Sequence, residues 1–263
     1  MIANFFRNLN EREVDYLLIS GQAAILYGAA TFSEDIDLWL NPVAKHILAF
    51  RDALQAADAR YYKLTPPLTK EFLKRGHGFH FLLKSGSESE VFLDVLGTPP
   101  RVDSFASACA ASQWMDTEWG RVRTIGIKDL VELKKTQRLE DYPVVSNLAL
   151  AWFEQPDCKR SRADYRWALQ NIFTLTALRQ FFEEHPRAIE ALPARDASGR
   201  MAFGECVAAD KEAPDATATK VERYMQQQIA ALQQADRRYW RSIIAELKQL
   251  RASDKLVSEG APV

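Results

Sequence analysis

The sequence is poor in cysteine, and it lacks a long apolar run and a secretion signal. Its three cysteines, Cys109, Cys158 and Cys206, are widely spaced and form no paired motif, so we expect a reducing compartment and no disulfide or zinc framework. No window approaches about eighteen uncharged apolar residues, which argues against a membrane span. The N-terminus has neither the apolar segment nor the cleavage site of a signal peptide. We therefore expect a cytoplasmic protein with no membrane partner.

An excess of charge of one sign is also lacking. The chain has 34 basic and 35 acidic side chains and a net charge of −1. A protein that binds polyanions through charge alone is strongly basic. The balance therefore argues against broad, nonspecific nucleic-acid binding and leaves room for a local nucleotide site. With 263 residues, 47% of them apolar, the chain can form one large domain or two smaller ones.

The pattern of the sequence changes near residue 150. Before that point, helical and strand-like patterns alternate: a short opening helix near 5–9, strands over 14–20, 36–40, 79–84 and 91–96, helices over 22–30 and 44–57, a turn over 84–90, and a helix from 128. Beyond it we expect helix over 160–184, a loop over 186–216 and a long helix over 218–251. The sequence thus predicts an α+β fold, with a small mixed or antiparallel sheet flanked by helices in a domain over 1–150 and a helical C-terminal domain over 151–263.

Three acidic residues lie in strand-like stretches. Asp35 and Asp37 alternate in DIDL and so point to one face of their strand. Two carboxylates on one face repel each other, and Mg²⁺ is commonly held by such carboxylates together with substrate phosphates. Asp94 lies in the apolar stretch VFLDVLG, where burying an acid is costly unless it serves a ligand. An Asp-x-Asp pair alone is common on solvated edges. The succession of strand, glycine turn, helix, acidic pair and second acidic strand favours a metal site.

This succession resembles the nucleotidyltransferase superfamily that includes DNA polymerase beta. The family pattern is a hydrophobic residue, Gly, Gly or Ser, a spacer, and Asp-h-Asp/Glu-h, where h is hydrophobic. The chain follows it with ISG, thirteen residues and DIDL. The stretch ISGQAAILYG…DIDLWL looks like a bacterial group of toxin-type and uncharacterised nucleotidyltransferases that carry GGxA…DIDL.

The resemblance implies an NTP site that uses metal ions. Asp35 and Asp37 would bind two Mg²⁺ ions, with Mn²⁺ as an alternative, and the phosphates of the NTP. Asp94 would complete the metal site and help deprotonate an acceptor hydroxyl. Ser20 and Gly21 would place the N-terminus of a helix toward the triphosphate. The toxin-like group implies a tRNA end or a protein as the acceptor and a cognate antitoxin as a partner, with a small antibiotic as another acceptor.

A second charged patch agrees with this interpretation. Lys134, Arg138 and Asp141 are spaced i, i+4, i+7 and would share one face of the predicted helix from 128. They resemble the family's DLxxxK…R…D segment, whose Lys is implicated in triphosphate binding. A solvated charged face explains the same spacing, and Lys135 competes for the role of Lys134.

The chain departs from the family pattern at three positions. Ser20 replaces a Gly, Thr31 stands where the bacterial group carries Arg, and Ser33, assigned with Gly21 to the nucleotide site, stands where it carries Thr. Loss of the guanidinium removes a charge-assisted contact to phosphate. These departures support an alternative: a non-catalytic protein that keeps the fold and senses a nucleotide or binds a partner.

Other candidate residues carry weaker signals. His77 and His80 would face opposite sides of a strand and have no cysteine or acid at a zinc spacing, so we interpret them as surface or structural residues. The basic cluster at 159–166, KRSRADYR, is a candidate contact for an RNA backbone or a solvated helix start.

Overall fold

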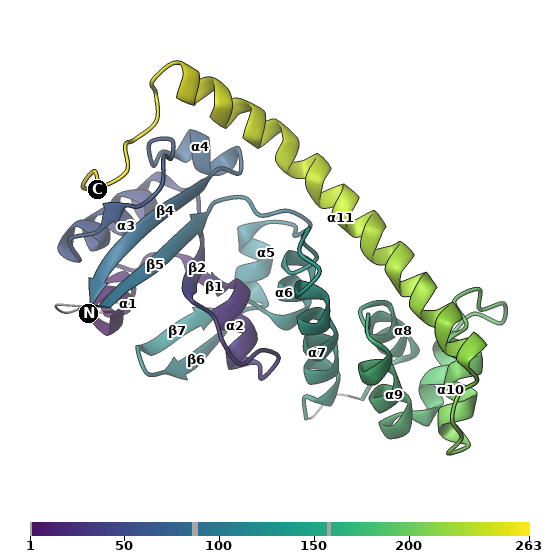
Figure 1. The fold of residues 1–263 in the computed structure, drawn as a ribbon. Coiled ribbons are helices and arrows are strands. Elements are labelled where there is room, and N and C mark those ends of the chain that lie inside the picture. Colours follow the sequence, from purple (N-terminus) through teal and green to yellow (C-terminus); the bar gives the residue numbers. More distant parts are fainter. Residues whose placement is uncertain (1, 86–88, 157–158) are drawn as a thin grey trace. The chain divides into compact units, whose positions relative to one another are not determined.

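The computed structural model describes residues 2–85, 89–156 and 159–263, which form an α+β fold, as predicted (Figure 1). The chain groups into two compact units. Unit 1 comprises Met1–Leu26, Thr31–Leu133 and Arg238–Val263, and unit 2 comprises Tyr27–Ala30 and Lys134–Arg237. The predicted domain boundary near residue 150 stays a prediction, because compactness does not test independent folding. Among the described helices, none combines the length and the apolar composition that crossing a membrane requires.

Unit 1 is built on a seven-stranded sheet in the order β3-β4-β5-β2-β1-β7-β6. Its strands are β1 (Tyr16–Ile19), β2 (Asp35–Leu40), β3 (Arg60–Tyr61), β4 (Gly78–Ser85), β5 (Ser89–Leu96), β6 (Gln113–Thr117) and β7 (Gly120–Thr124). β2 pairs parallel with β5 and β1 pairs parallel with β7, whereas the other neighbours are antiparallel. The sheet is therefore mixed.

Four strands agree with the sequence analysis, and three are additional. β1, β2, β4 and β5 lie where strands are predicted, and β4 and β5 are antiparallel neighbours as expected. Residues 86–88 of their predicted turn lie outside the described residues. β3 has two residues, too few to show alternation, β6 buries none of its side chains, and β7 buries only Val122 and Thr124. Short or exposed strands lack the apolar period on which prediction depends.

The described residues of unit 1 before residue 134 also form six helices. They are α1 (Ile2–Glu11), α2 (Ser20–Leu26), α3 (Ala44–Ala56), α4 (Lys70–Lys74), α5 (Phe105–Ala110) and α6 (Ile127–Leu133). α1 buries Phe5, Phe6 and Leu9, the apolar side expected of the opening helix, and packs on α3 and β7. α2 packs on β1 and β2 and so covers the sheet where the acidic strand begins.

Unit 2 is helical. Its elements are α7 (Asp141–Glu154), α8 (Arg162–Gln170), α9 (Leu175–Glu184), the 3-10 helix η1 (Pro186–Ala191), α10 (Arg200–Ala208) and the first part of α11 (Asp215–Ala252). Phe153, Phe181 and Val221 lie in its apolar core. The helix predicted over 160–184 is two helices, and the prediction of a loop over 186–216 is wrong. The small residues there that suggest a loop fill the core instead, as Ala188 and Ala191 do.

The C-terminal part of the chain returns to unit 1. The 38-residue helix α11 passes from unit 2 to unit 1 at Arg238. Glu246 on this helix accepts a hydrogen bond from Nε2 of His77 over 2.9 Å and also pairs with Arg75. Backbone bridges then join Arg60 to Pro262 and Thr65 to Val257. Because β3 is an edge strand, this segment occupies polar backbone groups that an edge leaves open.

Candidate metal centre

The alternation of strand β2 presents two carboxylates on one side of the sheet. Ile36 and Leu38 are buried, whereas Asp35 and Asp37 are half-buried. The opposite face of the strand therefore holds the apolar side chains in the core. The prediction that Asp35 and Asp37 share a face is confirmed.

The third acid comes from the neighbouring strand. Asp94 lies on β5 between the buried residues Leu93 and Val95. β5 runs parallel to β2, and their register places Asp94 beside Asp37. Side chains at paired positions point to the same face of a sheet. The parallel pairing therefore adds Asp94 to the side that carries the other two acids.

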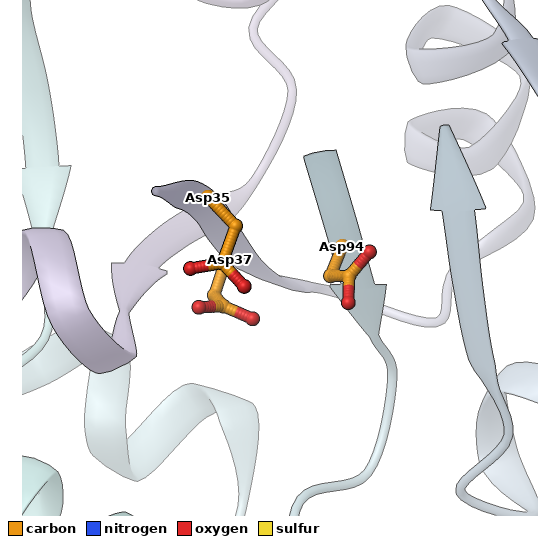
Figure 2. Close-up of side chains that lie close together, drawn as sticks. All are labelled: Asp35, Asp37 and Asp94. Atoms are coloured by element: carbon orange, nitrogen blue, oxygen red, sulfur yellow. The ribbon is translucent and has the colours of Figure 1, made fainter. Parts of the chain in front are cut away.

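The three carboxylates converge. One oxygen from each of Asp35, Asp37 and Asp94 lies within 4.8 Å of the other two, and Figure 2 shows the side chains of β2 and β5 on one side of the strands. Three carboxylates at this separation repel one another unless a cation or protons intervene. An all-oxygen donor set matches Mg²⁺ and Mn²⁺ and does not match the thiolate and imidazole sites typical of zinc. These residues could hold a hard divalent cation.

Two residues outside the predicted site hold Asp94. The hydroxyl of Tyr62 donates to Oδ1 of Asp94 over 2.6 Å, and Nδ1 of His80 lies 2.8 Å from the same oxygen. His80, interpreted from the sequence as a surface or structural residue, therefore contacts an acid of the candidate site. His77, in contrast, is buried with 1% exposure and contacts Glu246, so it is structural and not on the surface.

The electrostatics around Asp94 follow from these contacts. Burial raises the pKa of its carboxyl, but the hydrogen bond and charge of His80, with the Tyr62 hydroxyl and Lys63, outweigh burial, so the pKa is lowered. Burial and the Asp94 carboxylate raise the pKa of Tyr62. At neutral pH the pair is thus an ionised acid with a neutral phenol as donor.

Of the predicted nucleotide residues, Ser33 contacts Asp35, and Gly21 packs against Ser33. Ser20 has a φ of 59°, a left-handed conformation that costs least for Gly. A Cβ on Gly21 would lie 2.2 Å from Oγ of Ser33, so only Gly fits this approach. The Ser33 hydroxyl lies 3.1 Å from Oδ1 of Asp35 and donates to it. The start of α2 therefore packs against Ser33, and Ser33 in turn holds a residue of the acidic group.

The second charged patch differs from its prediction. α6 ends at Leu133 and α7 begins at Asp141, so Lys134, Arg138 and Asp141 do not share a helix face. The spacing of the charges is compatible with a continued helix, but α6 stops at Leu133 because Asp141 pairs with residues of the turn that follows it. Nζ of Lys134 lies 3.0 Å from Oδ1 of Asp141, and Nε of Arg138 lies 3.0 Å from Oδ2. The three residues form an ion cluster within unit 2 in which Lys134 and Asp141 are buried and Arg138 is exposed, and their role in nucleotide binding stays a prediction.

One residue of the basic cluster at 159–166, Arg160, has an internal role. Nε of Arg160 donates to the carbonyl of Phe153 over 3.0 Å, and Nη2 donates to that of Trp152 over 2.5 Å. These are carbonyls of the last turn of α7, where helix geometry leaves carbonyls without a full set of backbone partners; that of Trp152 also accepts the amide of Gln155 at the helix end. Arg160 therefore caps α7 and is not free for an RNA backbone.

Sequence reasoning missed Tyr62 and His80. His80 pairs with Asp94 in the antiparallel register of β4 and β5, a relation that requires the strand pairing to be known. Tyr62 lies outside any regular element, so no periodicity indicates it.

Neither a protein-family model nor a curated protein matches this chain. The resemblance of the sequence motif to nucleotidyltransferases therefore stays a prediction.

Proposed function

We propose that the protein is a Mg²⁺-dependent nucleotidyltransferase that moves a nucleoside monophosphate from an NTP to a hydroxyl acceptor. The observation that carries the proposal is the convergence of Asp35, Asp37 and Asp94, with Asp35 linked through Ser33 to the start of α2. The order of these residues in the sequence follows the motif of that superfamily, and the parallel pairing of β2 and β5 explains why the distant Asp94 completes the set.

The acidic residues have distinct roles in the proposed reaction. Asp35 and Asp37 would hold the divalent ions, which when bound neutralise the triphosphate and stabilise the entering and leaving oxygens. The acceptor oxygen forms a bond to the α-phosphorus while the bond from that phosphorus to the bridging oxygen breaks and pyrophosphate leaves. Asp94, fixed by Tyr62 and His80, would orient the acceptor hydroxyl and accept its proton. Positioning supplies most of the catalysis.

The acceptor belongs to the proposal as well. The toxin-like motif favours a tRNA end or a protein hydroxyl, with a cognate antitoxin as partner, and an antibiotic hydroxyl is the third option. The near-neutral net charge of −1 supports recognition at a local site over binding along a polyanion.

The test is transfer of label from each of the four NTPs, labelled at the α-phosphate, to a panel of tRNA, protein and aminoglycoside acceptors with Mg²⁺. Wild type should label one acceptor class, and Asp35→Asn should not. Asp116→Asn is the matched control, because this side chain is 91% exposed on the same unit. Absence of transfer by wild type, or equal transfer by Asp35→Asn, contradicts the proposal.

A non-catalytic nucleotide sensor is the second candidate. The observation that favours it is the pairing of Lys134 with Asp141, which engages the cation assigned to the triphosphate. Calorimetric titration with each NTP distinguishes the enzyme from the sensor. NTP binding that requires Mg²⁺ and disappears in Asp35→Asn supports the enzyme. Metal-independent NTP binding without nucleotidyl transfer supports the sensor.

A further inference from the structure

Unit 2 contains a buried arginine in an unfavourable electrostatic position. Arg200 is 4% exposed and is the first residue of α10. It follows Gly199, whose left-handed φ of 81° turns the chain into the helix. The N-terminus of a helix carries partial positive charge, so a buried cation there is costly.

The guanidinium of Arg200 is only partly satisfied. Its Nη2 donates to the carbonyl of Ile172 over 3.1 Å and to Oε1 of Gln228 over 3.3 Å. A guanidinium has five donor hydrogens. The hydrogen on Nε, which is shielded from solvent, and the two on Nη1 have no acceptor among the residues that the structure describes. Buried donors without partners are rare, and each calls for an explanation.

No carboxylate neutralises this charge among the described residues. The charge of Asp196 acts on Arg200 without an ion pair, and Oδ2 of Asp196 instead accepts from the backbone amide of Met201 over 2.8 Å and Oδ1 from that of Ser198. The ring of Tyr224 lies 5.3 Å from the guanidinium carbon. Burial lowers the pKa of Arg200, and Tyr224 and Asp196 only partly offset this effect. The site is thus short of one negative charge.

Arg200 lines a cavity of about 360 Å³ inside unit 2. One part of the wall is polar, with Arg166, Gln170, Gln228 and Asp196, whose two oxygens already accept hydrogen bonds, and another is apolar, with Leu192 and Pro193. Arg166 also lines the cavity and is exposed, so a second cationic side chain lies on its solvent side. A volume of several hundred cubic ångströms with an apolar wall and a few polar groups is typical of a small-molecule site.

We propose that this cavity binds a small organic acid, with its anionic oxygens at Arg200 and Arg166 and its apolar part against Leu192 and Pro193. The acid group supplies the missing charge and the missing acceptors, and a planar guanidinium suits carboxylate and phosphate alike. The cavity lies wholly in unit 2 and contains none of Asp35, Asp37 and Asp94. The inference therefore goes beyond the proposed function and does not depend on it.

The test compares three ligands that share a six-carbon chain. Hexanoate, hexyl phosphate and hexanol are titrated calorimetrically into the full-length protein in chloride buffer with EDTA, which removes divalent ions. At least one of the two anions should bind at one site, and hexanol should bind at least about tenfold more weakly, because hydrogen bonds to charged groups contribute this much or more. The stronger anion identifies the acid group. Absence of saturable binding of both anions up to about 10 mM, or equal binding of hexanol, overturns the proposal.

Variants then assign the site. Arg200→Gln should lower the affinity for the stronger anion about tenfold or more, and Arg166→Gln, an exposed change that leaves the core intact, should lower it several-fold to tenfold. Arg162→Gln is the matched control, because Arg162 is exposed and lines a different hollow of the same unit, and it should bind like wild type. If Arg200→Gln does not fold, Arg166→Gln decides: affinity equal to that of Arg162→Gln overturns the proposal. Asp35→Asn should bind the anion unchanged, so failure of nucleotidyl transfer is distinguishable from failure of this site.

Discussion

Nδ1 of His80 lies 2.8 Å from Oδ1 of Asp94, across the antiparallel pair of β4 and β5. The same oxygen accepts the hydroxyl of Tyr62. Two side chains from separate parts of unit 1 therefore fix the orientation of one acid of the candidate metal centre. Hydrogen bonds that orient a metal ligand affect the affinity of the site for its metal, in addition to the ligands themselves.

Removing one of these contacts should weaken metal binding. We expect Tyr62→Phe, which deletes only the hydroxyl, to lower the affinity for Mn²⁺ about tenfold or more, because Asp94 is then held on one side only. The measurement is calorimetric titration with Mn²⁺. Tyr239→Phe is the control, since its hydroxyl donates to the carbonyl of Thr98 instead. Equal affinities in the two variants contradict the prediction.

The close approach of Gly21 to Ser33 should be testable by rescue. Gly21→Ala places a Cβ 2.2 Å from Oγ and 2.7 Å from Cβ of Ser33, and overpacking of this kind costs about 1–3 kcal/mol. Adding Ser33→Gly leaves the Cα, 3.9 Å away, as the nearest atom of residue 33, so urea denaturation should show partial recovery. Adding Ser33→Ala instead removes the clash with Oγ but keeps the one with Cβ at 2.7 Å, so it should show less recovery than Ser33→Gly.

The acidic group should lower stability when no cation is bound. Asp35→Asn keeps an oxygen for the Ser33 hydroxyl and removes one of three like charges. In EDTA its free energy of unfolding should exceed that of wild type by about 1 kcal/mol. With Mg²⁺ the wild type should gain stability and the variant should gain less. A wild type whose urea midpoint is the same with EDTA and with Mg²⁺ would disprove the metal centre.

Stability at low pH should depend on Asp141. Burial raises the pKa of Asp141, but the charge of Lys134, the Thr136 hydroxyl and Arg138 outweigh burial and lower it. A carboxyl with a lowered pKa stabilises the fold above its unfolded pKa of about 3.9, and this stability is lost as the pH falls through the folded value. Between about pH 5 and pH 2 the unfolding free energy of wild type should therefore fall more steeply than that of Asp141→Asn.

At neutral pH, Asp141→Asn should lower the free energy of unfolding. Asp141→Asn leaves the ammonium of Lys134, which is 7% exposed, without its carboxylate, and loss of one partner of a buried pair costs about 3–5 kcal/mol. Urea denaturation at each pH measures both effects. Parallel pH profiles for the two proteins would show that Asp141 is not the group responsible.

The resistance of the second half of α11 to proteolysis should depend on Glu246. Hydrogen bonding from His77 and the charge of Arg75 lower the pKa of this carboxyl. Glu246→Gln weakens both contacts, so we expect faster proteolytic cleavage within residues 238–252 at pH 7. Glu222→Gln, on the exposed side of the same helix, should be cleaved like wild type. Identical cleavage rates in the two variants would show that Glu246 does not anchor the helix.

The candidate metal centre could largely be predicted because it follows from strand geometry. Alternation alone puts Asp35 and Asp37 on one face, and an acid among apolar residues of a buried strand marks Asp94. These relations are local to a strand, and local periodicity is what a sequence records most directly.

The contacts that surround the acids could not be predicted, because they depend on distant parts of the chain. His80 meets Asp94 only through the register of β4 and β5. Lys134 and Asp141 keep the i, i+7 spacing of a helix, yet they meet across a turn, where the ion pair and the hydroxyl of Thr136 replace helical hydrogen bonds. Propensity is a weak prior that tertiary contacts override.

The pairing of residues 257–263 with the β3 region bears on how the protein is made. Residues 238–263 belong to unit 1 but are synthesised after residues 134–237, which form most of unit 2. On the ribosome, the sheet therefore emerges with the outer edge of β3 uncovered. Residues 257–263, which pair with this region, follow only after the helical unit has been synthesised. Such long-range pairing is slow, and an uncovered edge invites association with other chains. Completion of unit 1 is thus a late event in biogenesis, and the interval before it is when a nascent chain is most exposed to aggregation.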